Sequence, residues 1–318
     1  MKDYMAPMEG ITNHIFRNAY HTFFHPMDKY FTPFISAKPD KRLSAKEIRE
    51  ISPETNQGLT VIPQILTNNA EDFLQTARIM KEYGHKELNL NLGCPSGTVT
   101  AKGKGSGFLK DPEILDRFLD KIMTGIENEG MRFSIKTRIG TYDEEDWELL
   151  LKIYSQYPLT ELIVHPRIQK DYYKGPVRLH AFACAAETIR VPLCYNGDLF
   201  TVSAYRDIAE RFPETEIFMY GRGLITNPAL VSEIREGKAR DKKVFRQFHD
   251  RIYRDYRELL GDERNVLFRM KELWSYLAGS FTNSSKYAKK IKKAQHYSDY
   301  EASVSSLFNE QELLENDI

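Results

Sequence analysis

The segment Glu87–Gly93 reads ELNLNLG, a short apolar run of the kind that forms a buried β-strand. Seven similar runs occur along the chain, and successive runs start 25 to 30 residues apart, except for one interval of 45 residues after Glu87. Most of the intervals contain amphipathic stretches with helical spacing, such as Ala70–Tyr83, Pro112–Met123 and Glu144–Tyr154. The other apolar runs are Tyr4–Gly10, Tyr30–Ser36, Leu59–Leu66, Arg132–Ile139, Glu161–Arg167, Val191–Asp198 and Glu216–Gly223.

Eight strands that alternate with helices are the layout of an α/β protein with a (β/α)8 TIM barrel. The dipeptide Asp111-Pro112 marks the start of one of these helices, because it places a capping residue before a first-turn proline. A doubly wound open sheet shows the same alternation, so the spacing alone leaves that alternative open. We expect the barrel.

The alternation stops after residue 238. The sequence therefore predicts two domains, a barrel over residues 1–238 and a small C-terminal all-α domain over residues 239–318. From Lys238 to Tyr300 there are 16 Lys and Arg against 8 Asp and Glu, an excess of 8 positive charges that the acidic end, Glu301–Asp317, conceals in the total. The helices expected in this domain are Phe245–Leu260, Val266–Phe281 and Ser285–Leu307.

The composition excludes several classes of protein. The 318 residues include 45 Lys and Arg and 45 Asp and Glu, so the net charge points to no nucleic-acid or membrane partner. The three cysteines form no CxxC pair, which argues against a disulfide framework or structural zinc and favours a reducing compartment. Met1–Gly10 lacks the core of a signal peptide, and no run of 18 apolar residues occurs. We expect a cytoplasmic globular protein with no metal and no membrane partner.

Catalytic groups of a barrel lie where its strands end, because the loops there converge on one pocket. Asn196-Gly197-Asp198 ends the seventh predicted strand and Gly221-Arg222-Gly223 ends the eighth. Loops at these places commonly bind phosphate through free backbone N–H groups, and Arg222 could add a charged contact. The alternative is a pair of tight turns that need glycine. Their position on adjacent strands favours phosphate.

Lys136 lies inside an apolar strand, where an ammonium group is costly unless it meets a negative partner. That partner is either a flavin ring, which gains negative charge on reduction, or an internal acidic side chain. Gln64 poses the same choice between the edge of a heterocycle and a satisfied core amide.

Cys94 follows Asn91-Leu92-Gly93 at a strand end and opens the longest interval, so the extra length forms the loop that carries it. We expect this thiol to be accessible, whereas the apolar neighbours of Cys184 and Cys194 predict burial. No histidine lies close to Cys94 in the sequence, which leaves a nucleophilic thiolate unsupported locally, although His165 could approach it in space. A thiol that donates a proton needs no base beside it.

The C-terminal helices interleave lysines with aromatic residues. Cations on more than one face of a helix could follow an RNA backbone, and aromatic rings could stack on bases. The alternative is a solvated lysine face over an aromatic helix-bundle core, which we prefer for most of the aromatic residues. The lysines are Lys286, Lys289, Lys290, Lys292 and Lys293.

Taken together, these residues resemble the tRNA-dihydrouridine synthases, a family of flavin-dependent barrel enzymes that reduce uridine in tRNA. The matching motifs occur in the family's order over residues 6–228, and the helical tail resembles the family's tRNA-binding domain, including Arg269-Met270-Lys271. Glu9 and Pro166 depart from the common pattern. The motifs are Ala6-Pro7-Met8, Leu92-Gly93-Cys94-Pro95-Ser96, Gly105-Ser106-Gly107, Ile135-Lys136-Thr137-Arg138, His165 with Arg167, Asn196-Gly197-Asp198, Gly221-Arg222-Gly223 and Asn227-Pro228.

The resemblance implies a role for each matching residue. Asn91 would bind the flipped-out uracil, with Arg167 and the lysines Lys286, Lys289 and Lys290 as further contacts to the RNA. Cys94 would be the general acid. The residues implied to bind FMN are Pro7, Met8, Glu9, Gln64, Lys136 and His165 around the ring, and Asn196, Gly197, Asp198, Gly221 and Arg222 at the ribityl chain and phosphate.

The implied reaction is the reduction of specific uridines in tRNA to 5,6-dihydrouridine. NADPH reduces FMN, the flavin passes a hydride to C6 of uracil, and Cys94 protonates C5. The resemblance thus implies FMN, NAD(P)H and tRNA as partners, and we expect a monomer. Two alternatives remain, an FMN barrel oxidoreductase of a small dihydropyrimidine-type substrate and a non-catalytic RNA-binding barrel.

Overall fold

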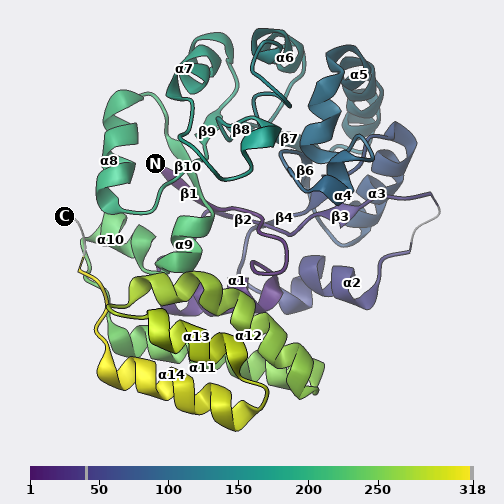
Figure 1. Cartoon of the computed structure of the whole chain (residues 1–318). Helices are drawn as coiled ribbons and strands as arrows, with labels where there is room; N and C mark the ends of the chain where they lie inside the picture. Colours follow the sequence, from purple (N-terminus) through teal and green to yellow (C-terminus); the bar gives the residue numbers. More distant parts are fainter. Residues whose placement is uncertain (40–41, 316–318) are drawn as a thin grey trace. The chain divides into compact units, whose positions relative to one another are not determined.

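The computed structural model of the protein describes residues 1–39 and 42–315. Its strands form one sheet in the order β3-β5-β6-β7-β8-β9-β10-β1-β2-β4, and the registered pairs are parallel (Figure 1). Every predicted apolar run overlaps at least one strand. The strands are β1 (Lys2–Met5), β2 (Lys29–Phe31), β3 (Ile35–Ser36), β4 (Val61–Ile62), β5 (Gln64–Leu66), β6 (Glu87–Leu92), β7 (Arg132–Thr137), β8 (Leu162–Val164), β9 (Leu193–Tyr195) and β10 (Ile217–Tyr220).

Two of the predicted strands are each divided into two parts. Pro33 lies between β2 and β3, and Pro63 lies between β4 and β5; proline has no N–H to give to a sheet. β2 pairs with β4 and β3 pairs with β5, so the two divided strands run side by side. The ten described strands therefore make eight, and the sheet closes on itself. The predicted TIM barrel is confirmed, and the open sheet is excluded.

The chain packs as two compact units, each built from segments that are distant in sequence. The first contains residues 1–7, 28–197 and 212–219, and the second contains residues 8–27, 198–211 and 220–318. The first holds the strands, apart from Tyr220, with α2 (Ala45–Ile51), α3 (Ala70–Glu82), α4 (Gly97–Thr100), α5 (Pro112–Asn128), α6 (Trp147–Tyr154) and α7 (Leu179–Thr188). The second holds α1 (His14–Phe23), α8 (Val202–Arg211), α9 (Arg222–Thr226), α10 (Leu230–Glu236), α11 (Lys242–Leu260), α12 (Glu263–Leu277), α13 (Ser285–Lys293) and α14 (Tyr297–Glu310).

Charged side chains gather where the strands begin. Lys29 Nζ lies 2.6 Å from Glu87 Oε1 and 3.0 Å from Glu161 Oε2, and the Tyr4 hydroxyl donates a hydrogen bond to Glu161 at 2.8 Å. Burial raises the pKa of Glu161, and the nearby Lys29 opposes that rise. A buried apolar cluster belongs to the same unit and contains Tyr4, Ala6, Phe31, Ile62, Ile163, Cys194, Ile217 and Met219.

The C-terminal helices have an aromatic core, as predicted. Trp274 and Tyr300 are buried, and the Trp274 indole donates to the Tyr300 hydroxyl at 2.8 Å. That hydroxyl in turn donates to Nε2 of the buried His249, 2.6 Å away, since an indole nitrogen cannot accept. The arrangement keeps the His249 ring neutral, and burial lowers the pKa of His249.

The single helix predicted over Ser285–Leu307 is wrong, because the chain breaks between α13 and α14. Contacts from α12 hold the break open. The Lys271 ammonium donates to the Ala294 carbonyl, and the Glu263 carboxylate accepts from the Tyr297 backbone N–H. These partners lie more than 20 residues away in the sequence. The break itself contains no glycine or proline, so the local sequence did not predict it. Cys184 is also less buried than predicted, whereas Cys194 is fully buried.

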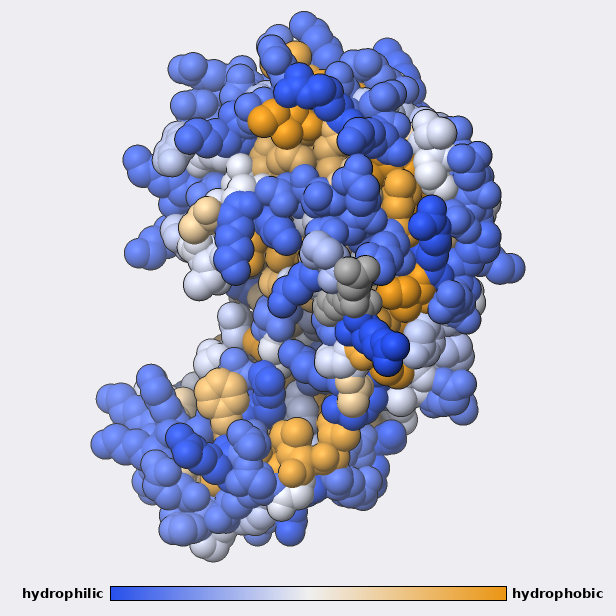
Figure 2. All heavy atoms as spheres, turned by 90° about the vertical axis from the view of Figure 1, so that its right-hand side faces the viewer, coloured by the Kyte–Doolittle hydropathy of each residue, from blue (hydrophilic) through white to orange (hydrophobic). Residues whose placement is uncertain are grey.

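The face shown in Figure 2 is mostly hydrophilic, and hydrophobic side chains show in separate patches. Among the described residues, no helix is both long and apolar enough to cross a membrane.

We predict that Lys29→Met lowers the free energy of unfolding by roughly 3–5 kcal/mol, because it leaves the buried Glu87 and Glu161 carboxylates facing each other without their shared cation. Urea unfolding at pH 7 measures the effect, with Lys152→Met on an exposed face of α6 as control. Equal stability of the two variants would contradict a structural role for this ion cluster.

Candidate active site

The site begins with the polar face of two long neighbouring strands. In β6, Leu88, Leu90 and Leu92 alternate with Asn89 and Asn91, and all five are buried. The β6–β7 register places Asn89 beside Ser134 and Asn91 beside Lys136. Lys136 is in turn registered with Ile163 of the apolar cluster, so these polar side chains share the face of the sheet that Ile163 presents.

Hydrogen bonds link most of this polar face. The Gln64 carboxamide donates to Asn89 Oδ1 at 2.8 Å and accepts from Asn91 Nδ2 at 2.7 Å. Asn89 also donates to the Ser134 hydroxyl at 2.9 Å. Gln64 is fully buried, so in this structure its amide lies within the barrel wall, and its contact with a heterocycle stays a prediction.

Lys136 differs from its neighbours because its ammonium makes no hydrogen bond or ion pair with any described side chain. Burial and, to a smaller extent, the nearby Arg138 guanidinium lower the pKa of Lys136 to about 8, while Cys194 and Cys94 act in the opposite direction. The internal acidic partner that the sequence left open is therefore absent from the described residues. A cation held in this way is a ready partner for an anionic or acceptor-rich ligand.

Asn91 also fixes the loop that carries Cys94. Its side-chain oxygen accepts from the backbone N–H groups of Gly93 at 3.1 Å and Cys94 at 2.9 Å. The other end of the same carboxamide holds Gln64, so one side chain ties the Cys94 backbone to the barrel wall. Cys94 is partly exposed, in agreement with the accessibility predicted for it.

The long interval after β6 folds back on Cys94. The Ser106 hydroxyl and N–H both donate to the Cys94 carbonyl, at 2.8 and 3.1 Å. Gly105 has φ +59° and lies so close that a Cβ there would be 2.8 Å from that carbonyl oxygen. A Cβ on Gly107 would lie 2.7 Å from the Thr100 carbonyl oxygen. The two glycines thus allow the segment around Ser106 to pack directly against the Cys94 backbone.

Arg138 is the residue whose role the sequence analysis missed. Its buried guanidinium donates to three backbone carbonyls, those of Gly93 at 2.9 Å, Ile168 at 2.8 Å and Tyr172 at 2.5 Å. It therefore joins the Cys94 loop to the loop after β8. The only local signal was a second cation two residues after Lys136, and its partners are 30 or more residues away.

His165 and Arg167 lie together at the end of β8. An Arg167 N–H lies 3.2 Å from His165 Nε2, and Arg167 also donates to the Gly175 carbonyl at 2.6 Å. Both side chains are buried, and the His165 ring stacks on Tyr173 at a centroid distance of 6.1 Å. The burial of Arg167 favours a role in orienting His165.

The ends of β9 and β10 are also joined. Asn196 Nδ2 donates to the Met219 carbonyl at 2.8 Å. A Cβ on Gly197 would lie 2.9 Å from Val177 and 3.6 Å from Pro166, so the glycine allows these neighbours to pack closely. Pro166, which departs from the family pattern, is therefore part of the packing at this strand end.

In the second unit, Arg222 donates to Asp198 Oδ1 at 2.6 Å, and its guanidinium lies over the Phe200 ring. Asp198 has the left-handed φ of +46°. A Cβ on Gly223 would lie 1.8 Å from the Leu199 carbonyl oxygen, so Gly221-Arg222-Gly223 packs directly on the segment after Asp198. Near the start of the same unit, Met8 is half-buried and Glu9 is exposed; Pro7, half-buried, ends the preceding segment.

The three tail lysines predicted to contact RNA lie on α13 and are exposed. Lys286 lies 3.7 Å from Glu310 and over the Tyr287 ring. Lys289 and Lys290 have no ion pair among the described residues.

The sequence profile of the family described as "Dihydrouridine synthase (Dus)" matches residues 4–318. The chain belongs to this family. It is therefore an enzyme, an oxidoreductase of tRNA processing.

Relatives of this dihydrouridine synthase agree with the assignment. A probable tRNA-dihydrouridine synthase of Staphylococcus epidermidis is 28% identical over 263 residues, which cover 79% of this chain and 78% of the relative. The tRNA-dihydrouridine(16) synthase of Pseudomonas putida is 29% identical over 255 residues, which cover 77% of each chain.

Solved structures share the fold of this dihydrouridine synthase. Morphinone reductase superposes with a TM-score of 0.55 at 12% identity over 77% of this chain and 88% of that one. Histamine dehydrogenase from Rhizobium sp. 4-9 superposes with a TM-score of 0.57 at 12% identity, over 74% of this chain and 46% of that one. The old yellow enzyme homologue from Zymomonas mobilis superposes with a TM-score of 0.56 at 12% identity, over 78% of this chain and 92% of that one.

We predict that Gly105→Ala lowers the rate at which the dihydrouridine synthase converts uridine about 100-fold, because the added methyl group would displace Cys94 by a fraction of an ångström or more. Gly130→Ala is the matched control, since Gly130 has φ +63° but open space around it. Both variants carry the cost of a left-handed alanine. If dihydrouridine yield under single-turnover conditions falls equally in the two, the close fold around Cys94 does not matter for activity.

Proposed function

We propose that this dihydrouridine synthase reduces specific uridines in tRNA to 5,6-dihydrouridine with FMN as cofactor, NADPH as reductant and Cys94 as general acid. The observation that carries the proposal is the Lys136 ammonium, which has no acidic partner among the described residues and interacts electrostatically with Cys94, whose backbone is held from two sides.

The residues present are compatible with both the ring and the phosphate of FMN. Lys136 offers a cation that has no acidic partner in the part of the chain that the structure describes, which suits a ring that becomes negatively charged. Gln64, His165, Pro7, Met8 and Glu9 would complete the ring site. The proposed ribityl and phosphate contacts are Asn196, Gly197, Asp198, Gly221 and Arg222, in a segment where Gly223 packs on Leu199 and Arg222 pairs with Asp198.

When bound, reduced FMN supplies the hydride that is added to C6 of the uracil. Cys94 then donates the proton of Sγ to C5, a contribution of about 10²–10⁴-fold in rate. The Lys136 and Arg138 cations interact electrostatically with Cys94, so they stabilise the thiolate that remains. Asn91 holds the Cys94 backbone and lies next to Lys136 in register, from where it would also contact the base.

The substrate is a base inside a folded RNA, so it must be flipped out of its stack at a cost of roughly a few kcal/mol. Lys286, Lys289 and Lys290 would hold the RNA backbone and help to offset that cost. Arg167 would act on the substrate side of the site through His165, which it contacts directly.

We predict that Cys94→Ala keeps FMN bound, with a visible spectrum that NADPH bleaches under anaerobic conditions, while dihydrouridine formation falls about 10²–10⁴-fold. The thiol interacts electrostatically with Lys136, and the proposal assigns it no contact that holds the flavin. Cys184→Ala, on α7, is the control and should retain full activity. Normal tRNA reduction by Cys94→Ala would disprove the general-acid role, and loss of FMN would show that Cys94 belongs to the cofactor site.

We predict that FMN binds the apoprotein more weakly as pH rises through about 8, because Lys136 loses its proton there and a neutral amine attracts the flavin less. The charged form exists below this pKa, so affinity is greatest at the lower pH. Quenching of flavin fluorescence between pH 7 and 9.5 measures the affinity. Lys136→Met should bind FMN weakly over the whole pH range. A pH dependence that persists in this variant would assign the titration to another group.

A further inference from the structure

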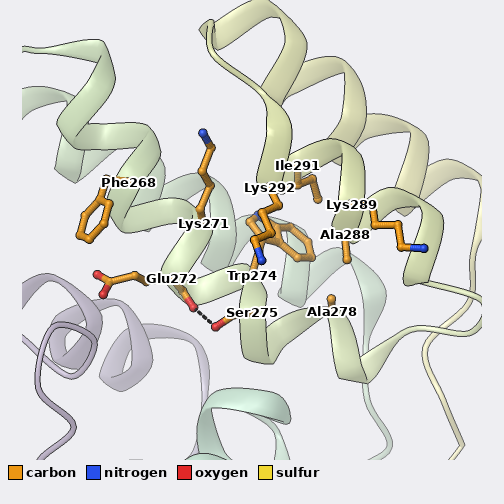
Figure 3. A pocket seen from close by; sticks show the side chains of 10 residues that line it. All are labelled: Phe268, Lys271, Glu272, Trp274, Ser275, Ala278, Ala288, Lys289, Ile291 and Lys292. Atoms are coloured by element: carbon orange, nitrogen blue, oxygen red, sulfur yellow. Dashed lines mark hydrogen bonds between the residues drawn. The ribbon is translucent and has the colours of Figure 1, made fainter.

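A groove of about 620 Å³ lies between α12 and α13 in the second unit (Figure 3). This volume is typical of sites for small organic groups, roughly 300–1,000 Å³. Its lining combines apolar side chains with the stems of lysines from both helices. The lining residues are Phe268, Lys271, Glu272, Trp274, Ser275, Ala278, Ala288, Lys289, Ile291 and Lys292.

The charge of the groove is positive and largely uncompensated. Lys289 and Lys292 are exposed and have no ion pair among the described residues. The acidic lining residue, Glu272, already binds Arg269 at 2.9 Å. Lys271 adds a third cation, although its ammonium is directed to the Ala294 carbonyl at the end of α13.

α13 accepts this charge at a cost to its own stability. It carries five lysines in nine residues and no acidic residue, so like charges stand three and four positions apart. Its buried side chains are only Tyr287 and Ile291, which anchor it to the domain. A surface arranged in this way becomes more stable when an anion binds to it.

The groove also offers an aromatic face. Phe268 is 56% exposed, which is unusual for phenylalanine, and it stands at one end of the lining in Figure 3. The Arg269 guanidinium lies 5.5 Å from the centre of its ring. Lysines beside an exposed ring and an apolar floor are the combination that binds single-stranded nucleic acid, where the backbone meets cations and bases stack on rings.

We propose that this groove, defined by Phe268, Lys289 and Lys292 with the floor around Trp274, holds an unstacked nucleotide of the bound tRNA. The inference rests on the proposed function and adds a subsite to it. The base would lie on Phe268 and the apolar floor, and the adjoining phosphates would face Lys289 and Lys292. An acidic peptide would satisfy the lysines but would leave the ring and the apolar floor without a partner.

The test compares two double variants of the full-length holoenzyme. Lys289→Glu with Lys292→Glu reverses the charge of the groove. Lys243→Glu with Lys293→Glu makes the same change in charge at exposed positions of α11 and α13 that do not line the groove. Dissociation constants for an unmodified tRNA transcript are measured by fluorescence anisotropy at several salt concentrations.

We expect the groove variant to bind roughly tenfold or more weakly than the control variant. Its salt dependence should fall by about one to two units of slope, because two phosphate contacts are lost. Phe268→Ala should weaken binding roughly 5- to 140-fold with an unchanged salt slope, since stacking releases no counterions. Leu259→Ala, another exposed apolar side chain of the same unit, is its control.

Equal affinity of the groove and control variants would overturn the inference. So would an unchanged affinity of Phe268→Ala, because the lysines would then act without a stacked base. Displacement of the transcript by polyglutamate of matched charge would assign the groove to an acidic protein. A wild-type enzyme that binds tRNA but forms no dihydrouridine would instead refute the proposed reaction, which separates the two failures.

Discussion

The parallel pairing of β6 with β7 is the constraint from which the candidate active site follows. Six registered residue pairs place Asn89 beside Ser134 and Asn91 beside Lys136. Since side chains alternate across a strand, the leucines of β6 point to one face and its asparagines to the other. A shift of one residue would exchange the two faces, place the leucines where the polar network lies and separate Asn91 from Gln64 and Lys136.

The two ends of the barrel treat buried charge in opposite ways. At the beginning of the strands, Lys29 has two carboxylates within 3.0 Å, so the charges compensate one another. Towards the end of the strands, Lys136 has a nearby cation and no acidic partner among the described residues. The first arrangement stabilises the folded chain by itself. The second is the arrangement that the proposed flavin would complete.

The helical unit repeats this distinction on its surface. Most of its aromatic residues are buried around Trp274, and His249 and Tyr300 satisfy one another's hydrogen bonds. On α13 the lysines have no acid within the helix, and Phe268 of α12 is exposed in the groove that Lys289 and Lys292 also line. An RNA ligand explains both departures with one partner, whereas a solvated lysine face leaves the exposed ring without a reason.

The sequence by itself determined eight strands that alternate with helices, because the apolar runs at regular spacing follow from local strand and helix preferences. Closure of the sheet into a barrel was decided by the pairing of β2 with β4 and of β3 with β5. The sequence also determined that Cys94 lies in a loop at a strand end and that Lys136 is an interior cation, since both follow from neighbouring residues. Only the tertiary structure decided that Arg138 joins the Cys94 loop to the loop after β8, that the chain breaks between α13 and α14, and that Phe268 and Lys289 line the same groove. Each of these depends on partners 20 or more residues away, whose contacts arise only when the packed elements bring them together.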